Sequence, residues 1–199
     1  MILTKTFLRN QAVDRKINEF STTTILNENR QISELKHTAT GKLFDLFISH
    51  SSLDKKLVLT LVDLFNDAGY SVYVDWINDK QLDRNSITKE TAQTIKTRVL
   101  ESSGLSYIAT QNATNSKWCP WELGIADGLK NGRVCICPVL DNSQDTFVGQ
   151  EYLGIYPYLV YTKEEKSGKD NFWVHDSANK KKYVVLSSWL TGTNPNLHE

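Results

Sequence analysis

Charge of one sign, cysteine, proline and long apolar runs are all scarce in this sequence of 199 residues. Its 23 lysines and arginines balance 23 aspartates and glutamates, so the formal net charge is zero with histidine neutral. A protein that gains its affinity mainly by neutralising phosphates needs a basic excess, and no long Lys/Arg block stands out either. The charge balance therefore argues against general nucleic-acid binding.

No stretch approaches the roughly 20 apolar residues that a membrane-spanning helix needs. The first segment, MILTKTFLRNQAVDRK, lacks the long apolar core and the small-residue cleavage site of a signal peptide. The three cysteines are too few for a disulfide framework, and their odd number fits a reducing compartment. We therefore expect a cytoplasmic protein with no membrane contact.

A zinc site is also disfavoured. Cys135 and Cys137 lie in an apolar stretch whose alternation sends both side chains to one sheet face, and no second Cys/His pair completes a four-ligand set. We interpret these cysteines as structural, and we expect no metal and no bound cofactor.

What is present is typical of a folded globular protein: 40% of the residues are hydrophobic and 10% are aromatic. Residues 1–40 are polar and contain one expected helix, near residues 24–35, so we interpret them as an N-terminal extension. Residues 41–199 form the expected domain, and its informative part begins with FDLFISH.

Apolar strand-like runs alternate with helix-length amphipathic segments along this domain. The expected strands are FDLFISH, YSVYVDW, LSYIAT and RVCICPVL, and the expected helices are LDKKLVLTLVDLFNDAG, residues 87–101 and PWELGIADGL. Gly104 is expected just past the second helix. Such alternation implies βαβ crossovers and a flavodoxin-like, doubly wound parallel sheet covered on both faces, an α/β fold. After it we expect a strand or hairpin, an exposed turn at KEEKSGKDN and a final helix.

Open α/β sheets bind ligands beyond the carboxyl ends of their strands. The first three expected strands end in Ser49-His50, Asp75-Trp76 and Thr110-Gln111, and the segment from Trp118 to Glu122 follows directly. No glycine-rich phosphate loop follows the first strand. The sequence therefore lacks the motif that identifies dinucleotide-fold dehydrogenases and P-loop NTPases, and both functions are disfavoured. A receiver domain that accepts a phosphoryl group would need acidic metal ligands after the first strand, where this sequence has Ser49 and His50.

Between about residues 42 and 140 the sequence resembles the TIR domain family, specifically the bacterial TIR-like proteins of antiphage defence. FDLFISHSSLDK is similar to the family's first strand and loop, and SKWCPWELGIA to the tract around its catalytic glutamate. In TIR enzymes that cleave NAD, a tryptophan stands four residues before this glutamate, and here these residues are Trp118 and Glu122. Residues 147–161 also resemble the tail of Thoeris-type TIR proteins.

The resemblance implies a TIR fold and an NAD nucleosidase or ADP-ribosyl cyclase that releases nicotinamide and forms an ADP-ribose-derived signal, expected to be cyclic. NAD is then substrate and not cofactor. Self-association into a homo-oligomer and a downstream effector of the nucleotide are also implied. The alternatives are a non-enzymatic TIR adaptor that acts by TIR–TIR association and a nucleoside deoxyribosyltransferase-like enzyme.

The chemistry agrees with a single carboxylate. Nicotinamide leaves a cationic pyridinium as a neutral molecule, so no general acid has to protonate it, unlike the leaving group of an ordinary glycosidase. Glu122 could stabilise the oxocarbenium-like charge, and Trp118 would share its helix face if the helix extends back that far. The competing interpretations are a favourable helix-dipole position for Glu122 and simple packing for Trp118.

The remaining candidates are expected substrate contacts with structural alternatives. Ser49 could instead cap the next helix, and His50 could be a histidine hydrogen-bonded within a loop. Asp75 could cap a turn or pair with Arg84, and Arg84 could bind a diphosphate or be solvated. Trp76 leads into the loop that helps to form the active site in TIR proteins.

Overall fold

The computed structural model describes residues 1–199 except 19–20, 80–87, 143–144, 146–150, 166 and 198–199. Its described strands form one nine-stranded sheet. These strands are β1 (Leu3–Thr4), β2 (Phe44–Ser49), β3 (Val72–Tyr73), β4 (Ser102–Ala109), β5 (Val134–Leu140), β6 (Tyr158–Lys163), β7 (Asp170–His175), β8 (Lys182–Val185) and β9 (Asn196–Leu197).

The parallel half of the sheet runs β3-β2-β4-β5-β6, and antiparallel pairs add β7, β8 and β9 beyond it. Numbered from β2, the parallel strands have the order 2-1-3-4-5, which is the flavodoxin-like doubly wound order. β1 pairs in parallel with the end of β5, through Leu3 and Val139. The fold class expected from the sequence is therefore confirmed.

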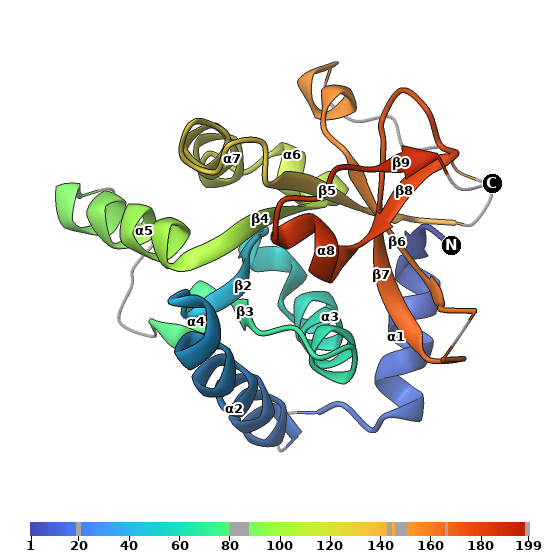
Figure 1. Cartoon of the computed structure of the whole chain (residues 1–199). Helices are drawn as coiled ribbons and strands as arrows, with labels where there is room; N and C mark the ends of the chain where they lie inside the picture. The colour runs from blue at the N-terminus through green and yellow to red at the C-terminus, as the bar shows by residue number, and fades with distance from the viewer. Residues whose placement is uncertain (19–20, 80–87, 143–144, 146–150, 166, 198–199) are drawn as a thin grey trace.

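Helices cover both faces of the sheet. They are α1 (Lys5–Asp14), α2 (Ser21–Thr40), α3 (Lys55–Asp67), α4 (Asp75–Asn78), α5 (Lys89–Glu101), α6 (Gln111–Thr114), α7 (Trp118–Leu129) and α8 (Leu186–Leu190), with 3-10 turns η1 (Ser52–Asp54) and η2 (Glu151–Ile155). In Figure 1, α5 and α7 lie above the strands, and α1, α2 and α3 lie below them. The core consists of two apolar clusters, one between the sheet and the helices on each of its faces.

The cysteines lie where strand alternation places them. Cys135 and Cys137 are fully buried on the α1/α3 face of β5, and Cys119 is buried on the other face. All three are free thiols, and burial raises the pKa of Cys137 to about 12. Burial also raises the pKa of Cys135. A thiol that stays protonated at neutral pH is a poor nucleophile, so Cys135 and Cys137 act in packing.

The N-terminal extension contains more structure than the sequence predicts. It holds two helices and a short strand in place of one helix. α2 seals the open edge of β3, because the Asn29 amide donates to the Val72 carbonyl (2.8 Å) and accepts from the Val72 N–H (2.7 Å). The side-chain amide of Asn29 thus makes the two hydrogen bonds that a further strand would make at this edge.

Two sequence interpretations are wrong in detail. YSVYVDW forms a strand only over β3, because the Asn78 side chain accepts the Val74 N–H at 2.8 Å and the chain turns into α4. Asp75 and Trp76 therefore open a short helix. Gly104 lies inside β4 and does not terminate a helix. A Cβ there would lie 2.9 Å from the Arg133 carbonyl oxygen, so the glycine permits close backbone approach.

The C-terminal additions are larger than expected. KEEKSGKDN joins β6 to β7, and its described residues are mostly exposed, as expected for a turn. β8, α8 and β9 then follow, so α8 is not the last element. Trp189 of α8 is buried in the core on the α1/α3 side of the sheet.

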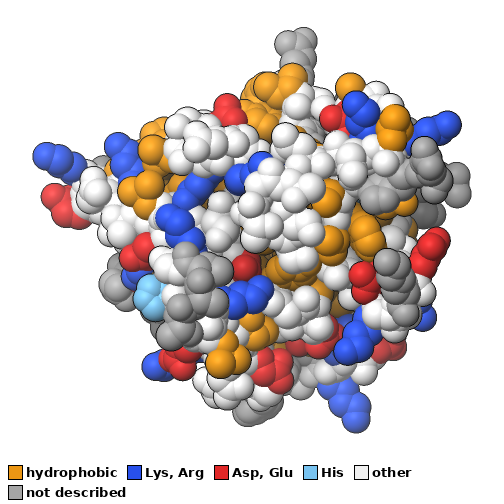
Figure 2. Space-filling view, viewed as in Figure 1, with side chains coloured by type: hydrophobic (Ala, Val, Ile, Leu, Met, Phe, Trp, Pro, Cys, Tyr) orange, Lys and Arg blue, Asp and Glu red, His pale blue; other side chains and the backbone are white. Residues whose placement is uncertain are grey.

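The surface agrees with the zero net charge. Acidic and basic side chains are interspersed over the face drawn in Figure 2. Among the described residues, no helix combines the length and the apolar character needed to cross a membrane.

Candidate active site

The centre of the candidate site is a contact between Ser49 and Glu122, which are 73 positions apart in the chain. Ser49 is the last residue of β2, and Glu122 lies in the second turn of α7. The Ser49 hydroxyl donates to Glu122 Oε2 at 2.6 Å, and both residues are fully buried. A short hydrogen bond to a buried carboxylate fixes the orientation of that carboxylate.

The start of α7 positions the glutamate. The Ser116 hydroxyl accepts from the N–H groups of Trp118 and Cys119, both at 3.3 Å, and so caps the first turn. The helix begins at Trp118, earlier than Pro120, so Trp118 and Glu122 lie one turn apart on one helix face. Trp118 also packs edge-to-face on Trp121, with ring centroids 5.5 Å apart.

Both tryptophans are half-buried against the core cluster of this sheet face. Trp118 is the tryptophan expected at the site, and its exposure does not distinguish it from Trp121. Their spacing from Glu122 still differs, because Trp121 precedes it by one residue and therefore points elsewhere around the helix.

A second polar group joins His50, Trp76 and Asp75. Trp76 Nε1–H donates to His50 Nε2 at 3.0 Å. An indole N–H can only donate, so the imidazole proton is on Nδ1, from which it donates to the Ile48 carbonyl at 3.0 Å. Asp75 Oδ1 lies 3.5 Å from His50 Nε2. His50 is only 2% exposed, so in this conformation it is the loop-bonded histidine of the alternative interpretation.

Asp54 is a buried residue of this edge that the sequence analysis missed. Its two carboxylate oxygens accept from the Thr110 hydroxyl and from the Asn112 amide, both at 2.6 Å. These bonds tie η1 to the end of β4 and to α6. The available signal was the carboxylate of SSLD, directly after the first strand.

Asp79, at the end of α4, is held from two sides. Arg98 of α5 donates to both of its oxygens, at 2.7 and 2.9 Å, and Tyr73 donates at 2.8 Å. The hydrogen bonds from Arg98 lower the pKa of Asp79, while burial raises the pKa of Tyr73. The pair joins α4 to α5. Arg84 lies outside the described residues, and so does its expected pairing with Asp75.

No group of three or more His, Cys, Asp or Glu side chains within the described part of the chain could hold a metal ion. The described chemistry at this edge is therefore that of buried carboxylates, hydroxyl donors, an imidazole that accepts on Nε2 and indole rings.

Comparison with known proteins identifies the family of this chain. Residues 46–171 match the model of the TIR domain family. A protein of Bacillus cereus (strain MSX-D12), named a probable 3′ cyclic ADP-D-ribose synthase, ThsB′, is 44% identical over 151 residues, which are 75% of this chain and 77% of that protein.

Two further proteins are more distant. A protein of Cytobacillus dafuensis whose name describes a cyclic ADP-D-ribose synthase, TIR2, is 30% identical over 104 residues, which are 52% of this chain and 27% of that protein. The crystal structure of the TIR domain of the Toll-related receptor TRR-2 from Hydra magnipapillata gives a TM-score of 0.43 at 20% identity, covering 58% of this chain and 82% of that domain. From the family match and the Bacillus cereus relative, this chain belongs to the TIR domain family.

Proposed function

We propose that this chain is a TIR enzyme that cleaves the nicotinamide–ribose bond of NAD and forms a cyclic ADP-ribose in Thoeris-type antiphage defence. The observation that carries the proposal is the buried Ser49–Glu122 contact at the carboxyl edge of the sheet. The names of the two curated relatives, both cyclic ADP-D-ribose synthases, support the product class.

In the proposed reaction, the bond between the ribose anomeric carbon and the pyridinium nitrogen breaks, and the electron pair goes to nitrogen. Nicotinamide therefore leaves neutral, without a proton. Glu122 stabilises the positive charge that develops on the ribose, a preorganised electrostatic effect. A nucleophile of the same ADP-ribose unit then bonds to the anomeric carbon, which closes the ring. If that nucleophile is a hydroxyl, it releases its proton to solvent.

The other residues have proposed supporting roles. Ser49 holds the carboxylate of Glu122, and Trp118 forms a wall for the substrate one helical turn away. Trp76 and Asp75 form the opposite rim, with His50 bonded to Trp76, and Arg84 is proposed as a diphosphate contact. Glu122 is fully buried, so we propose that NAD reaches it after neighbouring segments move, for example on assembly.

The setting of the reaction is also a proposal. We propose a cytoplasmic homo-oligomer whose nucleotide product acts on a separate effector. Residues 1–40 form an extension that covers the sheet edge, and residues 41–199 form the TIR domain with its C-terminal decoration.

Mass spectrometry of nucleotides from phage-infected cells that produce the chain tests this function. The expected result is nicotinamide together with an ion of the mass of cyclic ADP-ribose. Linear ADP-ribose alone would show hydrolysis without cyclisation. Unchanged NAD in infected cells that contain the folded protein would contradict the proposal.

A further inference from the structure

A cavity lies on the sheet face opposite Glu122. It lies between α1 and the start of α3, and its volume is about 620 Å³. This is within the range of roughly 300–1,000 Å³ typical of small-molecule sites. The glutamate belongs to α7, which packs with the core cluster of the other face. The cavity therefore lies on the other side of the sheet from Glu122, and it reaches the carboxyl edge of the sheet at Asp54 and Asn112.

The polar lining of the cavity is mainly basic. Lys5, Arg9, Lys55 and Lys56 line it, and Asp54 is the one carboxylate among its lining residues in the described chain. Both oxygens of Asp54 already accept hydrogen bonds from Thr110 and Asn112. The positive charge is therefore only partly compensated by the protein.

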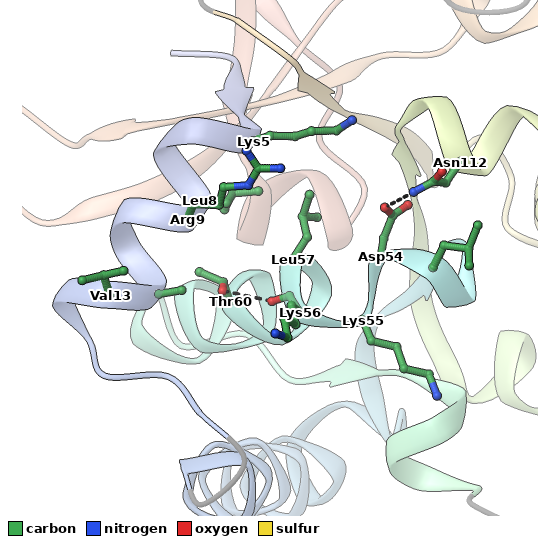
Figure 3. A pocket seen from close by; sticks show the side chains of 12 residues that line it. Lys5, Leu8, Arg9, Val13, Asp54, Lys55, Lys56, Leu57, Thr60 and Asn112 are labelled. Atoms are coloured by element: carbon green, nitrogen blue, oxygen red, sulfur yellow. Dashed lines mark hydrogen bonds between the residues drawn. The ribbon is translucent and has the colours of Figure 1, made fainter.

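The four cations are not equivalent. Lys5 pairs with the exposed Asp141 at 2.6 Å, and Lys55 lies over the Trp76 ring at 5.7 Å. Within the part of the chain that the structure describes, neither Arg9 nor Lys56 has an ion-pair partner. In Figure 3, Lys5 and Arg9 reach from α1 over the space beside Leu57, and Lys55 points away from them.

The same cavity has apolar walls. On α1, Leu8, Ala12 and Val13 share the helix face of Lys5 and Arg9, because these positions follow helical spacing. Leu57 lines the α3 side. Val13 is 75% exposed and Leu53, on η1, is 79% exposed, so two large apolar side chains border the cavity in water. Inorganic phosphate would leave both uncovered.

We propose that this cavity binds a nucleoside diphosphate unit, with the diphosphate on Arg9, Lys5 and Lys56 and the nucleoside against Leu57 and Val13. The planar guanidinium of Arg9 matches two phosphate oxygens at once. NAD, ADP-ribose and ADP all contain this unit. The proposal goes beyond the proposed reaction, since it concerns the face away from Glu122.

Isothermal titration of the full chain with ADP tests the site, using the Glu122→Gln variant so that no NAD turnover interferes. The added double change Arg9→Glu and Lys56→Glu is expected to weaken ADP binding at least tenfold. The matched control, Lys163→Glu with Lys181→Glu, makes the same change in net charge at the end of β6 and in the turn before β8, and it should bind ADP as the parent does. Circular dichroism verifies that every variant is folded.

Amide chemical shifts locate the ligand. ADP should shift the signals of Ala12, Val13 and Leu57, and pyrophosphate should bind more weakly than ADP because it lacks the nucleoside. Parallel titrations with NAD and ADP-ribose identify the preferred nucleotide. Shifts confined to the surroundings of Ser49 and Glu122, or equal binding of ADP and pyrophosphate, would overturn the proposal. Nicotinamide release is measured separately, so loss of this site and loss of the proposed enzyme activity are distinguishable.

Discussion

At the scale of single residues, the site depends on how one buried carboxylate is held. Ser49 ends β2 at the edge where open α/β sheets place their ligands, and its hydroxyl reaches the glutamate of a helix 73 positions later. In the proposed reaction, this contact sets the orientation of the Glu122 carboxylate before positive charge develops on the ribose, as electrostatic catalysis by a preorganised group requires.

Replacing Ser49 with alanine removes this donor. Because a hydrogen bond to a charged group is worth about 1.5–3 kcal/mol, we expect nicotinamide release to fall about ten- to a hundredfold. The initial rate of nicotinamide release, measured at a fixed NAD concentration, checks the prediction. Ser52→Ala, at an exposed position of η1, is the control. An unchanged rate in folded Ser49→Ala protein would remove Ser49 from the account.

At the scale of elements, α2 closes the sheet edge that β3 would otherwise expose. Asn29 is only 3% exposed and makes both of its bonds to one residue of β3. Asn66 of α3 also donates to the Ile25 carbonyl at 2.9 Å, which ties α2 to its neighbouring helix. The edge therefore depends on side-chain amides.

Asn29→Ala should destabilise the fold by about 2–3 kcal/mol, since it leaves the buried backbone groups of Val72 without their partner. Chemical denaturation measures the free energy of unfolding. Asn27→Ala, at an exposed position of the same helix, should change it by less than about 0.5 kcal/mol. Equal effects of the two substitutions would show that the amide pairing contributes nothing specific.

The end of α7 carries a buried lysine that couples stability to pH. Lys130 donates to the carbonyls of Leu100 and Ser102, and burial, helped by the charge of Lys42, lowers the pKa of Lys130 from 10.5 to about 8. The folded state therefore binds fewer protons than the unfolded state between these two values. The cost of burying the charge is full below about pH 8 and disappears as the pH rises toward 10.5.

Lys130→Met removes this group. The free energy of unfolding of the natural chain, minus that of Lys130→Met, is expected to increase between pH 8 and 10.5 and to stay level below pH 8. Denaturant titrations at several pH values give the free energy of unfolding of both proteins. Groups that titrate in the same way in both proteins contribute equally, so their contributions cancel in the difference. A difference that is flat across the whole range would contradict the lowered pKa.

How far the sequence predicts the structure differs between elements. Local apolar periodicity predicts the places of α3 and of four parallel strands, β2, β3, β4 and β5, although β3 is shorter than expected. β1 has two residues and is defined by its pairing with β5, more than 130 positions away, which no local pattern shows. Gly104 looked like a helix stop because its neighbours in space, Arg133 and Leu190, are distant in sequence.

Prediction of the candidate site from the sequence is limited in the same way. Strand ends predicted that Ser49, His50, Asp75 and Trp76 would lie at one edge, but periodicity does not specify which side chains bond to one another. The Ser49–Glu122 and Trp76–His50 contacts depend on tertiary packing and needed the structure. Asp54 was missed for the same reason, since its partners Thr110 and Asn112 follow a later strand.

At the scale of the whole molecule, the sheet separates two regions of different chemistry. The α5/α7 side contributes the buried carboxylate, and the α1/α3 side contributes a basic cavity. A chain with zero net charge can thus present local positive charge to a nucleotide without the field that attracts polyanions.

The central claim is that Glu122 cleaves NAD, and the most direct measurement is nicotinamide release by the natural chain, Glu122→Gln and Glu28→Gln in infected cells. Glu122→Gln keeps the size of the side chain and removes its charge, while Glu28 is exposed on α2. Nicotinamide and the cyclic product are expected from the natural chain and from Glu28→Gln, with at least a hundredfold loss in Glu122→Gln. Undiminished release by folded Glu122→Gln protein would contradict the account.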